Sequence, residues 1–278
     1  MFVASKKDVD VNWSEFTLIL PAVSIGNVGQ LAVDLVVSSI SPNAHHIGYF
    51  YDSCVLPVVG NDAFTQSAES LGKLNVSVEV YKNDDLKFVV VQQRAPLVKG
   101  RQAEYCKKLV SWIKCCKFKQ VILVSSISAT ERLDSQIEGS PLRYLVTPAA
   151  KNLLPLFDGL SWKTLEKRPK FPHMTEELSD ENRDFYLPGG GITKKFYEAC
   201  CKDDVPLAVL LTFCSEGDNI SDAVNLFLYL NDWLKMVPRR EVEQNVLGKT
   251  SKYLQWLIFL LVLCRKKDGS CTFCHNTL

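Results

Sequence analysis

A strand, a turn and a helix follow one another near the N-terminus, and this unit constrains the fold more than any other stretch. Residues 17–25 form a short apolar run rich in β-branched side chains, which leads into a turn containing Gly26 and Asn27. Between residues 28 and 40, apolar residues recur at helical spacing. Such a unit opens many parallel α/β domains, and ligands or partners bind at the loop after its strand.

The turn lacks the pattern of a dinucleotide-binding loop. Of the three glycines in Gly-x-Gly-x-x-Gly, only Gly26 and Gly29 are present, and the first helical turn carries Asn27 and Gln30 without a lysine. One interpretation is a tight turn with close packing of the helix start. The alternative is a partner-binding loop, with Gly26, Asn27 and Gly29 as its candidate residues.

Composition narrows the class of protein. The chain has 278 residues, 47% of them hydrophobic, and a formal net charge of +1. This length suffices for a sizeable core, and the balanced charge argues against a nucleic-acid partner. The N-terminus lacks the apolar segment of a signal peptide, and most of the ten cysteines lie in apolar patterns typical of reduced thiols. We therefore expect a cytoplasmic and nuclear protein with no metal or cofactor.

Hydrophobic periodicity predicts an α/β fold with a single, mostly parallel sheet flanked by helices. An antiparallel excursion is expected where two short apolar runs flank residues 83–85. Residues 163–184 hold many charges and are expected to be exposed. Strands are predicted over residues 17–25, 47–51, 76–80, 86–91, 121–124, 142–147 and 207–213, and helices over residues 28–40, 100–116, 192–201 and 221–236.

Consecutive glycines precede the third predicted helix. The candidate residues are Pro188, Gly189, Gly190 and Gly191, followed by Lys194. Their backbone N–H groups can face an anion or a closely approaching partner. The alternative is a helix entry that needs positive φ angles, which glycine adopts without strain. No neighbouring general base indicates catalysis.

A second candidate loop follows the last predicted strand. Glu216, Gly217, Asp218 and Asn219 lie at its carboxyl end, where the sites of α/β proteins gather. Asn219 or Ser221 is also a suitable N-cap for the next helix, so a solvated turn is the alternative.

Other short motifs carry little weight. Gly248-Lys249-Thr250 lacks the upstream glycine of a phosphate-binding loop, and the Cys271–His275 string has neither the compartment nor the surrounding domain of a haem site. Thr147 precedes Pro148 and is a minimal proline-directed phosphorylation site. Without a coherent acid–base pair, the residues favour a binding protein over an enzyme.

Several stretches together resemble the proteasome assembly chaperone family. They are FTLILPAVSIGNVGQLAVD (16–34), IGYFY (47–51), LRYLVTP (142–148), LPGGGITK (187–194), AVLLTFCSEGDNISDA (208–223) and YLNDWL (229–234). The resemblance covers about residues 12–236. The PGGGIT and SEGDN strings are specific in combination.

This resemblance implies a non-catalytic chaperone with a fold similar to that of purine nucleoside phosphorylases. Such a protein forms a heterodimer with proteasome assembly chaperone 1 and binds α subunits of the 20S proteasome. The pair promotes the α ring, prevents aberrant dimerisation of α rings and leaves as the core particle matures. The alternative is a nucleoside phosphorylase or hydrolase on a similar fold.

The resemblance ends before the C-terminus. We expect a single chaperone domain over residues 1–252 and a divergent apolar, cysteine-containing tail over 253–278. Related chaperones can dock on the α ring through a C-terminal motif with a penultimate tyrosine, whereas Thr277 occupies that place here. The apolar run Trp256 to Cys264 is too short to span a bilayer. We expect the tail to be poorly ordered or to add an apolar surface.

Overall fold

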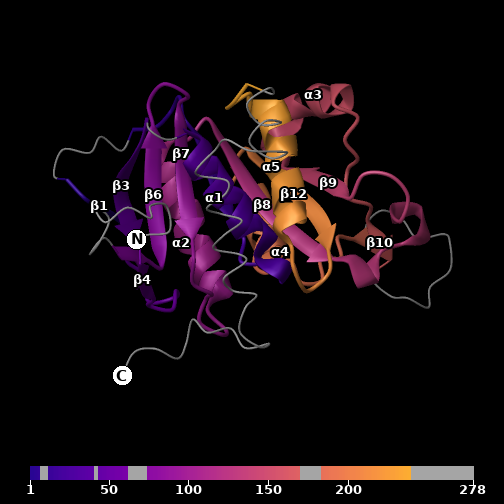
Figure 1. The fold of residues 1–278 in the computed structure, drawn as a ribbon, viewed down its shortest axis with the longest axis horizontal. Helices are drawn as coiled ribbons and strands as arrows, with labels where there is room; N and C mark the ends of the chain where they lie inside the picture. Colours follow the sequence, from indigo (N-terminus) through magenta and orange to yellow (C-terminus); the bar gives the residue numbers. More distant parts are fainter. Residues whose placement is uncertain (7–11, 41–42, 62–73, 170–182, 239–278) are drawn as a thin grey trace.

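The computed structural model describes residues 1–6, 12–40, 43–61, 74–169 and 183–238. Within these ranges an eight-stranded sheet separates two helical layers (Figure 1). Two short strand pairs lie outside it: β4 (Val59–Asn61) with β5 (Leu74–Val76), and β10 (Arg168–Pro169) with β11 (Arg183–Asp184). The strands of the large sheet are β1 (Phe2–Ala4), β2 (Thr17–Pro21), β3 (Ala44–Phe50), β6 (Val78–Asn83), β7 (Phe88–Gln93), β8 (Gln120–Ser128), β9 (Leu142–Val146) and β12 (Leu207–Cys214).

The sheet is parallel at its centre and antiparallel toward both edges. Its strand order is β1-β3-β6-β7-β2-β8-β12-β9, with β7, β2, β8 and β12 parallel. β6 and β7 form the expected hairpin, since a short turn can join only antiparallel neighbours. The structure confirms the α/β class and the single sheet flanked by helices, and it confines parallel pairing to the four central strands.

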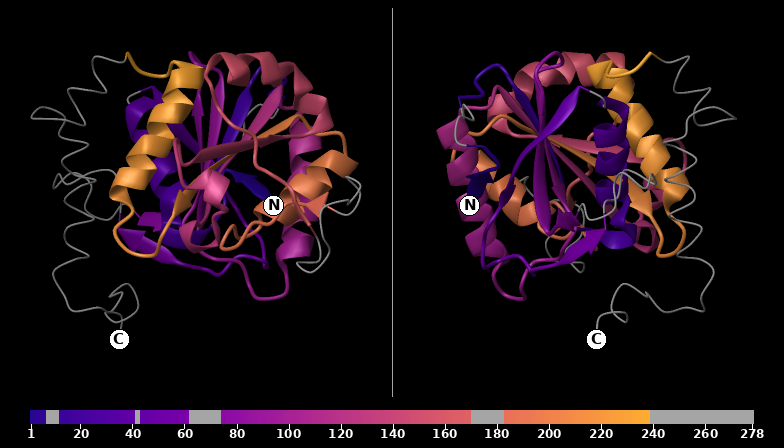
Figure 2. Two further views of the ribbon diagram at one scale, coloured as in Figure 1. Left: turned by 90° about the vertical axis from the view of Figure 1, so that its right-hand side faces the viewer. Right: turned by 60° about the vertical axis from the view of Figure 1, so that its left-hand side comes forward.

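Two pairs of helices cover the sheet (Figure 2). α1 (Val28–Ile40) packs beside α5 (Ile220–Leu234) on one face, and α2 (Gln102–Cys116) packs beside α4 (Thr193–Lys202) on the other. A short helix, α3 (Leu154–Gly159), follows β9. The four long helices are those expected from apolar spacing, and their observed ends lie within two residues of the predicted ends.

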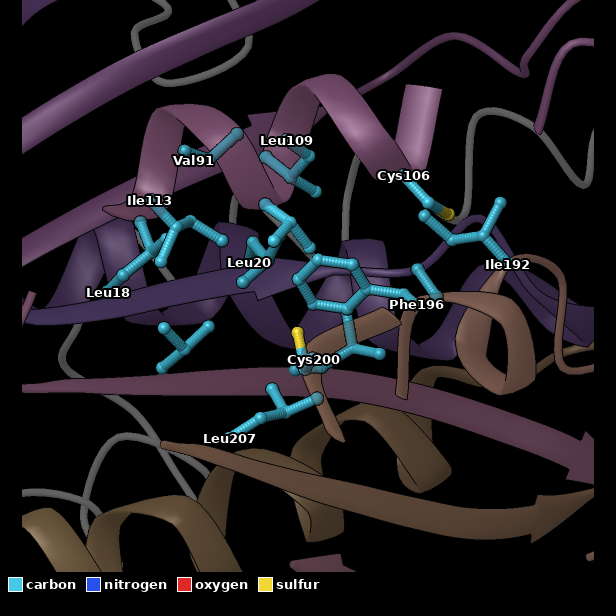
Figure 3. Packing of buried hydrophobic residues seen from close by; sticks show 14 of the residues in the cluster. Leu18, Leu20, Val91, Cys106, Leu109, Ile113, Ile192, Phe196, Cys200 and Leu207 are labelled. Atoms are coloured by element: carbon cyan, nitrogen blue, oxygen red, sulfur yellow. The ribbon is translucent and has the colours of Figure 1, made fainter. Parts of the chain in front are cut away.

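The core consists of two apolar clusters, one on each side of the sheet. Successive residues of a strand face opposite sides, so Leu18 and Leu20 face the α2–α4 layer and Ile19 faces the α1–α5 layer. Figure 3 shows Leu18 and Leu20 with Leu109 of α2 and Phe196 of α4. Burial on both faces explains why the central strands read as continuous apolar runs.

The first strand is shorter than its apolar run predicts. β2 ends at Pro21, and a 3-10 turn covers Ile25–Asn27. The left-handed backbone of this turn lies beyond the strand, at Gly26 and Asn27, whose φ angles are 66° and 53°. The apolar run continues from the strand into the turn, and hydrophobicity alone does not separate the two.

The segment predicted to be exposed is partly buried. Leu165 is buried and donates its N–H to the Tyr144 carbonyl, and Glu166 binds Arg143 of β9. Periodicity missed this because the segment is anchored by one buried leucine and one ion pair. Its residues 170–182, and the whole predicted tail over 253–278, lie outside the described residues.

Candidate functional site

Three loops meet at the carboxyl end of the parallel strands. The loop after β2 contacts the glycine-rich loop before α4, because the Ile25 N–H donates to the Gly189 carbonyl at 2.8 Å. The end of β8 joins the same group, with the Ser128 N–H donating to the Pro188 carbonyl at 2.9 Å. Asn219, in the loop after β12, places its side chain against Gly26. The structure thus brings together three regions that the sequence nominated separately.

The glycines pack backbone against backbone. A Cβ atom at Gly191 would lie 2.1 Å from the Val23 carbonyl oxygen, and one at Gly29 would lie 2.5 Å from that of Val124. At Gly26 it would lie 2.5 Å from Nδ2 of Asn219. A side chain at Gly191 or Gly29 would overlap backbone atoms, and one at Gly26 would have to displace the Asn219 side chain. Other atoms of the protein therefore occupy the space beside these glycines. This packing explains why glycine is needed there without invoking a bound phosphate.

Positive φ angles give the glycine-rich loop its shape. Gly189 has a φ of 74° and Gly191 a φ of 59°. Ile192 and Phe196, one helical turn apart, are buried and hold the start of α4 against the core (Figure 3). The loop is therefore fixed in two ways. Its glycines adopt φ angles that would strain other residues, and the helix that follows it is packed against the core.

Buried hydroxyl groups cross-link the loops. The hydroxyls of Ser24 and Ser126 lie 2.7 Å apart, and the Ser126 N–H donates to Ser24 Oγ at 3.1 Å. Ser125 and Thr193 form a second pair at 2.7 Å. Thr193 Oγ1 also lies 2.6 Å from the Gly190 carbonyl, which it reaches as donor. These hydroxyls are engaged in structural bonds rather than poised as nucleophiles.

The described histidines lie away from this cluster. His45 and His46 belong to β3, three strands away from β2 in the sheet. His173 and His275 lie outside the described residues. Nucleophilic catalysis requires a base within hydrogen-bond reach of the hydroxyl, and neither His45 nor His46 is placed to supply one here.

The acidic loop after β12 faces solvent. Glu216, Gly217 and Asp218 are exposed, whereas Asn219 is buried and donates from Nδ2 to the Gly217 carbonyl at 3.0 Å. Asn219 occupies the N-cap position of α5, yet its side chain makes no capping bond and turns toward Gly26 instead. Its place at the helix start was expected from sequence, and its contact with the first loop was not.

The cluster therefore offers a fixed surface of polar groups. Its solvent-facing members are Asn27, Gly189, Gly191, Glu216, Gly217 and Asp218. Exposed backbone and carboxylates on a rigid support are suited to contact with another protein. Whether these residues bind a partner stays a prediction.

Thr147 lies in the interior. Its hydroxyl donates to the Val205 carbonyl at 2.7 Å and accepts from the Leu207 N–H at 3.0 Å. The side chain is fully buried. The TP dipeptide alone could not reveal this burial. Phosphorylation of Thr147 would require local unfolding, so the folded structure argues against this predicted site.

One polar network escaped the sequence reasoning. Arg94 forms a two-pronged ion pair with Asp34 of α1, at 2.9 and 3.2 Å, and its Nε lies 3.8 Å from Glu79 of β6. Glu79 also accepts from Asn75 at 2.7 Å and from the Tyr81 hydroxyl at 3.1 Å. Burial raises the pKa of Tyr81, so its phenol remains a donor. The sequence signal for this network was Asp34, an acidic residue on the apolar face of a predicted helix.

A second missed pair joins β9 to the segment after α3. Arg143 is completely buried, and its Nε lies 3.1 Å from a carboxylate oxygen of Glu166. Its Nη1 donates to the Ser140 and Leu142 carbonyls, both at 2.9 Å. A lone arginine in the apolar run LRYLV is the sequence signal for a buried, paired cation.

The described residues show neither a metal centre nor a transmembrane helix. In these ranges no three side chains of the metal-binding types gather in one place. None of the described helices combines the length and the apolar character needed to cross a bilayer.

Comparison with known proteins places the chain among relatives along most of its length. A protein of Nematostella vectensis named proteasome assembly chaperone 2 is 61% identical over 246 residues, or 88% of this chain and 100% of the relative. A Danio rerio protein of the same name is 45% identical over 240 residues, or 86% of this chain and 90% of the relative.

Solved structures show the same fold. Pyrococcus furiosus PbaA, described as an archaeal homolog of proteasome-assembly chaperone, superposes with a TM-score of 0.61 at 14% identity. The match covers 95% of each chain. The PAC2 family domain itself matches residues 18–236, which run from β2 to just beyond α5. This chain therefore belongs to the PAC2 family.

Proposed function

We propose that this chain is a non-catalytic chaperone of 20S proteasome assembly. The observation that carries the proposal is its 61% identity to a proteasome assembly chaperone 2 across that relative's entire length. That alignment spans 246 residues, or 88% of this chain. The fold shared with PbaA supports the same role.

In this proposal the chain works as one half of a pair. It forms a heterodimer with proteasome assembly chaperone 1 and binds proteasome α subunits in the cytoplasm and nucleus. The pair promotes formation of the α ring and prevents aberrant α-ring dimers. It is released or degraded when the core particle matures.

The geometry of the glycine loops supports binding rather than catalysis. A phosphorylase or hydrolase needs a cradle for an anion and a base beside it. Here atoms of Val23, Val124 and Asn219 occupy the space beside the glycines. The buried hydroxyls form hydrogen bonds to the backbone or to one another. This arrangement favours a surface that acts through contact.

The test is co-expression of the full chain with proteasome assembly chaperone 1, followed by native mass spectrometry with and without purified α subunits. We expect a one-to-one complex that captures α subunits. A folded chain that forms no heterodimer and captures no α subunit would contradict the proposal. A heterodimer without α-subunit capture would restrict the function to pairing and contradict the α-ring role.

A further inference from the structure

Exposed apolar side chains gather at one edge of the sheet. More than half of the large hydrophobic residues that the described surface exposes lie on or beside β1, β3 and the β4–β5 pair. Tyr51 has the most exposed of these side chains, at 81%. We call this region the edge surface, and its members are Val3, Tyr49, Tyr51, Val58, Val59 and Leu74.

A groove runs through the edge surface. Tyr49, Tyr51, Val58 and Val59 line one side, and α2 lines the other with Trp112 among its residues. Its volume of about 1650 Å³ exceeds the roughly 300–1,000 Å³ of ordinary small-molecule pockets. The groove has the size of a bound polypeptide segment rather than of a metabolite.

The charges that line the groove cancel. Lys108 lies 3.2 Å from Asp52 and 2.9 Å from Glu104, and Glu104 also pairs with Arg101 at 2.8 Å. With Lys107, the lining holds two acids and two bases. An uncharged, apolar occupant matches this groove, because there is no net charge to complement.

The adjoining edge strand offers free backbone groups. The Tyr51 N–H donates to the Met1 carbonyl and the Ser5 N–H donates to the Ile47 carbonyl, both at 2.8 Å. Because antiparallel pairing alternates, the N–H and C=O groups of Phe2 and Ala4 point away from β3. Within the described ranges β1 ends the sheet on this side. An open edge beside apolar side chains is a template for another strand.

We propose that the edge surface binds the partner subunit of the chaperone pair through β-strand addition. An extended, uncharged segment of the partner pairs with the outer side of β1 and places its apolar side chains on Tyr49, Tyr51 and Val59. This inference rests on the proposed function, which supplies the partner. A large apolar contact with a polar rim is typical of subunits that stay together.

Two substitutions separate the side-chain and backbone parts of the proposal. Tyr51→Lys places a charge at the most exposed position of the surface. Ala4→Pro removes an outward N–H and leaves the bonds between β1 and β3 intact. Ile137→Lys is the matched control, because Ile137 is 59% exposed and lies outside the edge surface.

The affinity of each variant for purified proteasome assembly chaperone 1 is measured by titration calorimetry. Circular dichroism melts of each variant alone check folding. We expect Tyr51→Lys and Ala4→Pro each to weaken binding about tenfold or more, and Ile137→Lys to bind like the unaltered chain. Hydrogen exchange of the Phe2 and Ala4 amides should slow in the complex, which a purely side-chain contact would not cause.

Three results would overturn the inference. If the unaltered pair forms and neither Tyr51→Lys nor Ala4→Pro weakens it, the interface lies elsewhere while the chaperone proposal stands. If Tyr51→Lys weakens it and Ala4→Pro does not, strand addition is wrong. If the chain instead self-associates through Tyr51 without affecting the pair, the occupant is a second copy. Absence of any pair would contradict the proposed function itself.

Discussion

Position 191 shows how one residue type can be required by its neighbours rather than by chemistry. Any Cβ there would meet the Val23 carbonyl oxygen at 2.1 Å, and the φ of 59° is unfavourable for other residues. We expect Gly191→Ala to lower the free energy of unfolding by about 2–5 kcal/mol, from strain and overpacking together. Urea denaturation of the purified chain measures this loss.

Gly139→Ala is the matched control for that prediction. Gly139 also has a positive φ, of 87°, but no atom lies within 4 Å of an added Cβ. Its substitution carries only the conformational cost, about 1 kcal/mol. Equal losses at the two positions would show that the contact with Val23 does not matter.

The Arg143–Glu166 pair predicts a pH-dependent stability. Burial raises the pKa of Glu166, but hydrogen bonds from Gln136, its own backbone and Arg143 outweigh it and lower this pKa overall. A carboxylate with a lowered pKa stabilises the fold above its unfolded pKa, about 4.3, and loses this contribution as the pH falls through the folded value.

We therefore expect Glu166→Gln to destabilise the chain at pH 7 and to differ less from the unaltered chain as the pH falls below about 4. The loss at pH 7 should be about 1–2 kcal/mol, less than for a fully buried pair, because Glu166 is about one-third exposed. Unfolding free energies measured from pH 7 to pH 3 test this. A difference that stays constant with pH would contradict the role of the carboxylate charge.

At the scale of elements, aromatic side chains fasten the N-terminal segment to α2. Trp13 lies edge-on to Phe2 and Trp112, with ring centroids 5.6 and 5.9 Å away, and it also contacts Phe118 at 5.3 Å. It is 1% exposed. Trp13→Ala should lower the free energy of unfolding by about 3–5 kcal/mol, which equilibrium denaturation can measure.

Trp13→Phe separates the apolar contacts of Trp13 from its indole N–H group. The buried indole N–H of Trp13 has no hydrogen-bond partner among the described residues. Phenylalanine keeps most of the apolar contact and removes this unpaired donor, so we expect a much smaller loss than for alanine. A loss as large as that of alanine would mean that the indole shape is essential.

Local patterns predicted the elements better than their arrangement. Residues 28–40 have apolar residues at helical spacing and residues 207–213 form a continuous apolar run, and both elements were found where expected. The antiparallel direction of β9 was not predictable, because periodicity carries no information about a strand's neighbours. The contact between Gly26 and Asn219 joins loops almost 200 residues apart, so no local rule predicts it.

Candidate residues fared similarly. The glycine at 191 could be recognised as necessary, but only the structure shows that Val23 is the reason. The burial of Thr147 and Arg143 depends on which segments cover them, which a single sequence does not reveal. The edge surface was missed because its tyrosines and valines belong to different elements.

At the scale of the whole molecule, the PAC2 family domain matches residues 18–236 and ends before the predicted tail, residues 253–278. Because the tail lies outside that domain, we expect its removal to change the melting temperature of the chain by less than about 2 °C. Differential scanning calorimetry of the full and truncated chains tests this. A large decrease would show that the tail stabilises the fold.

The position of β2 has a consequence for how the chain is made. This strand emerges early during synthesis, yet it lies between β7 and β8, whose pairing residues follow it by about 70 and 100 positions. At roughly 5–20 residues per second, the ribosome needs about 5–20 s to deliver β8. A strand destined for the centre of the sheet therefore has neither neighbour until β7 is made, and lacks β8 until the end of that interval. A protein proposed to assist the assembly of other proteins thus exposes an unpaired strand of its own central sheet while it is being translated.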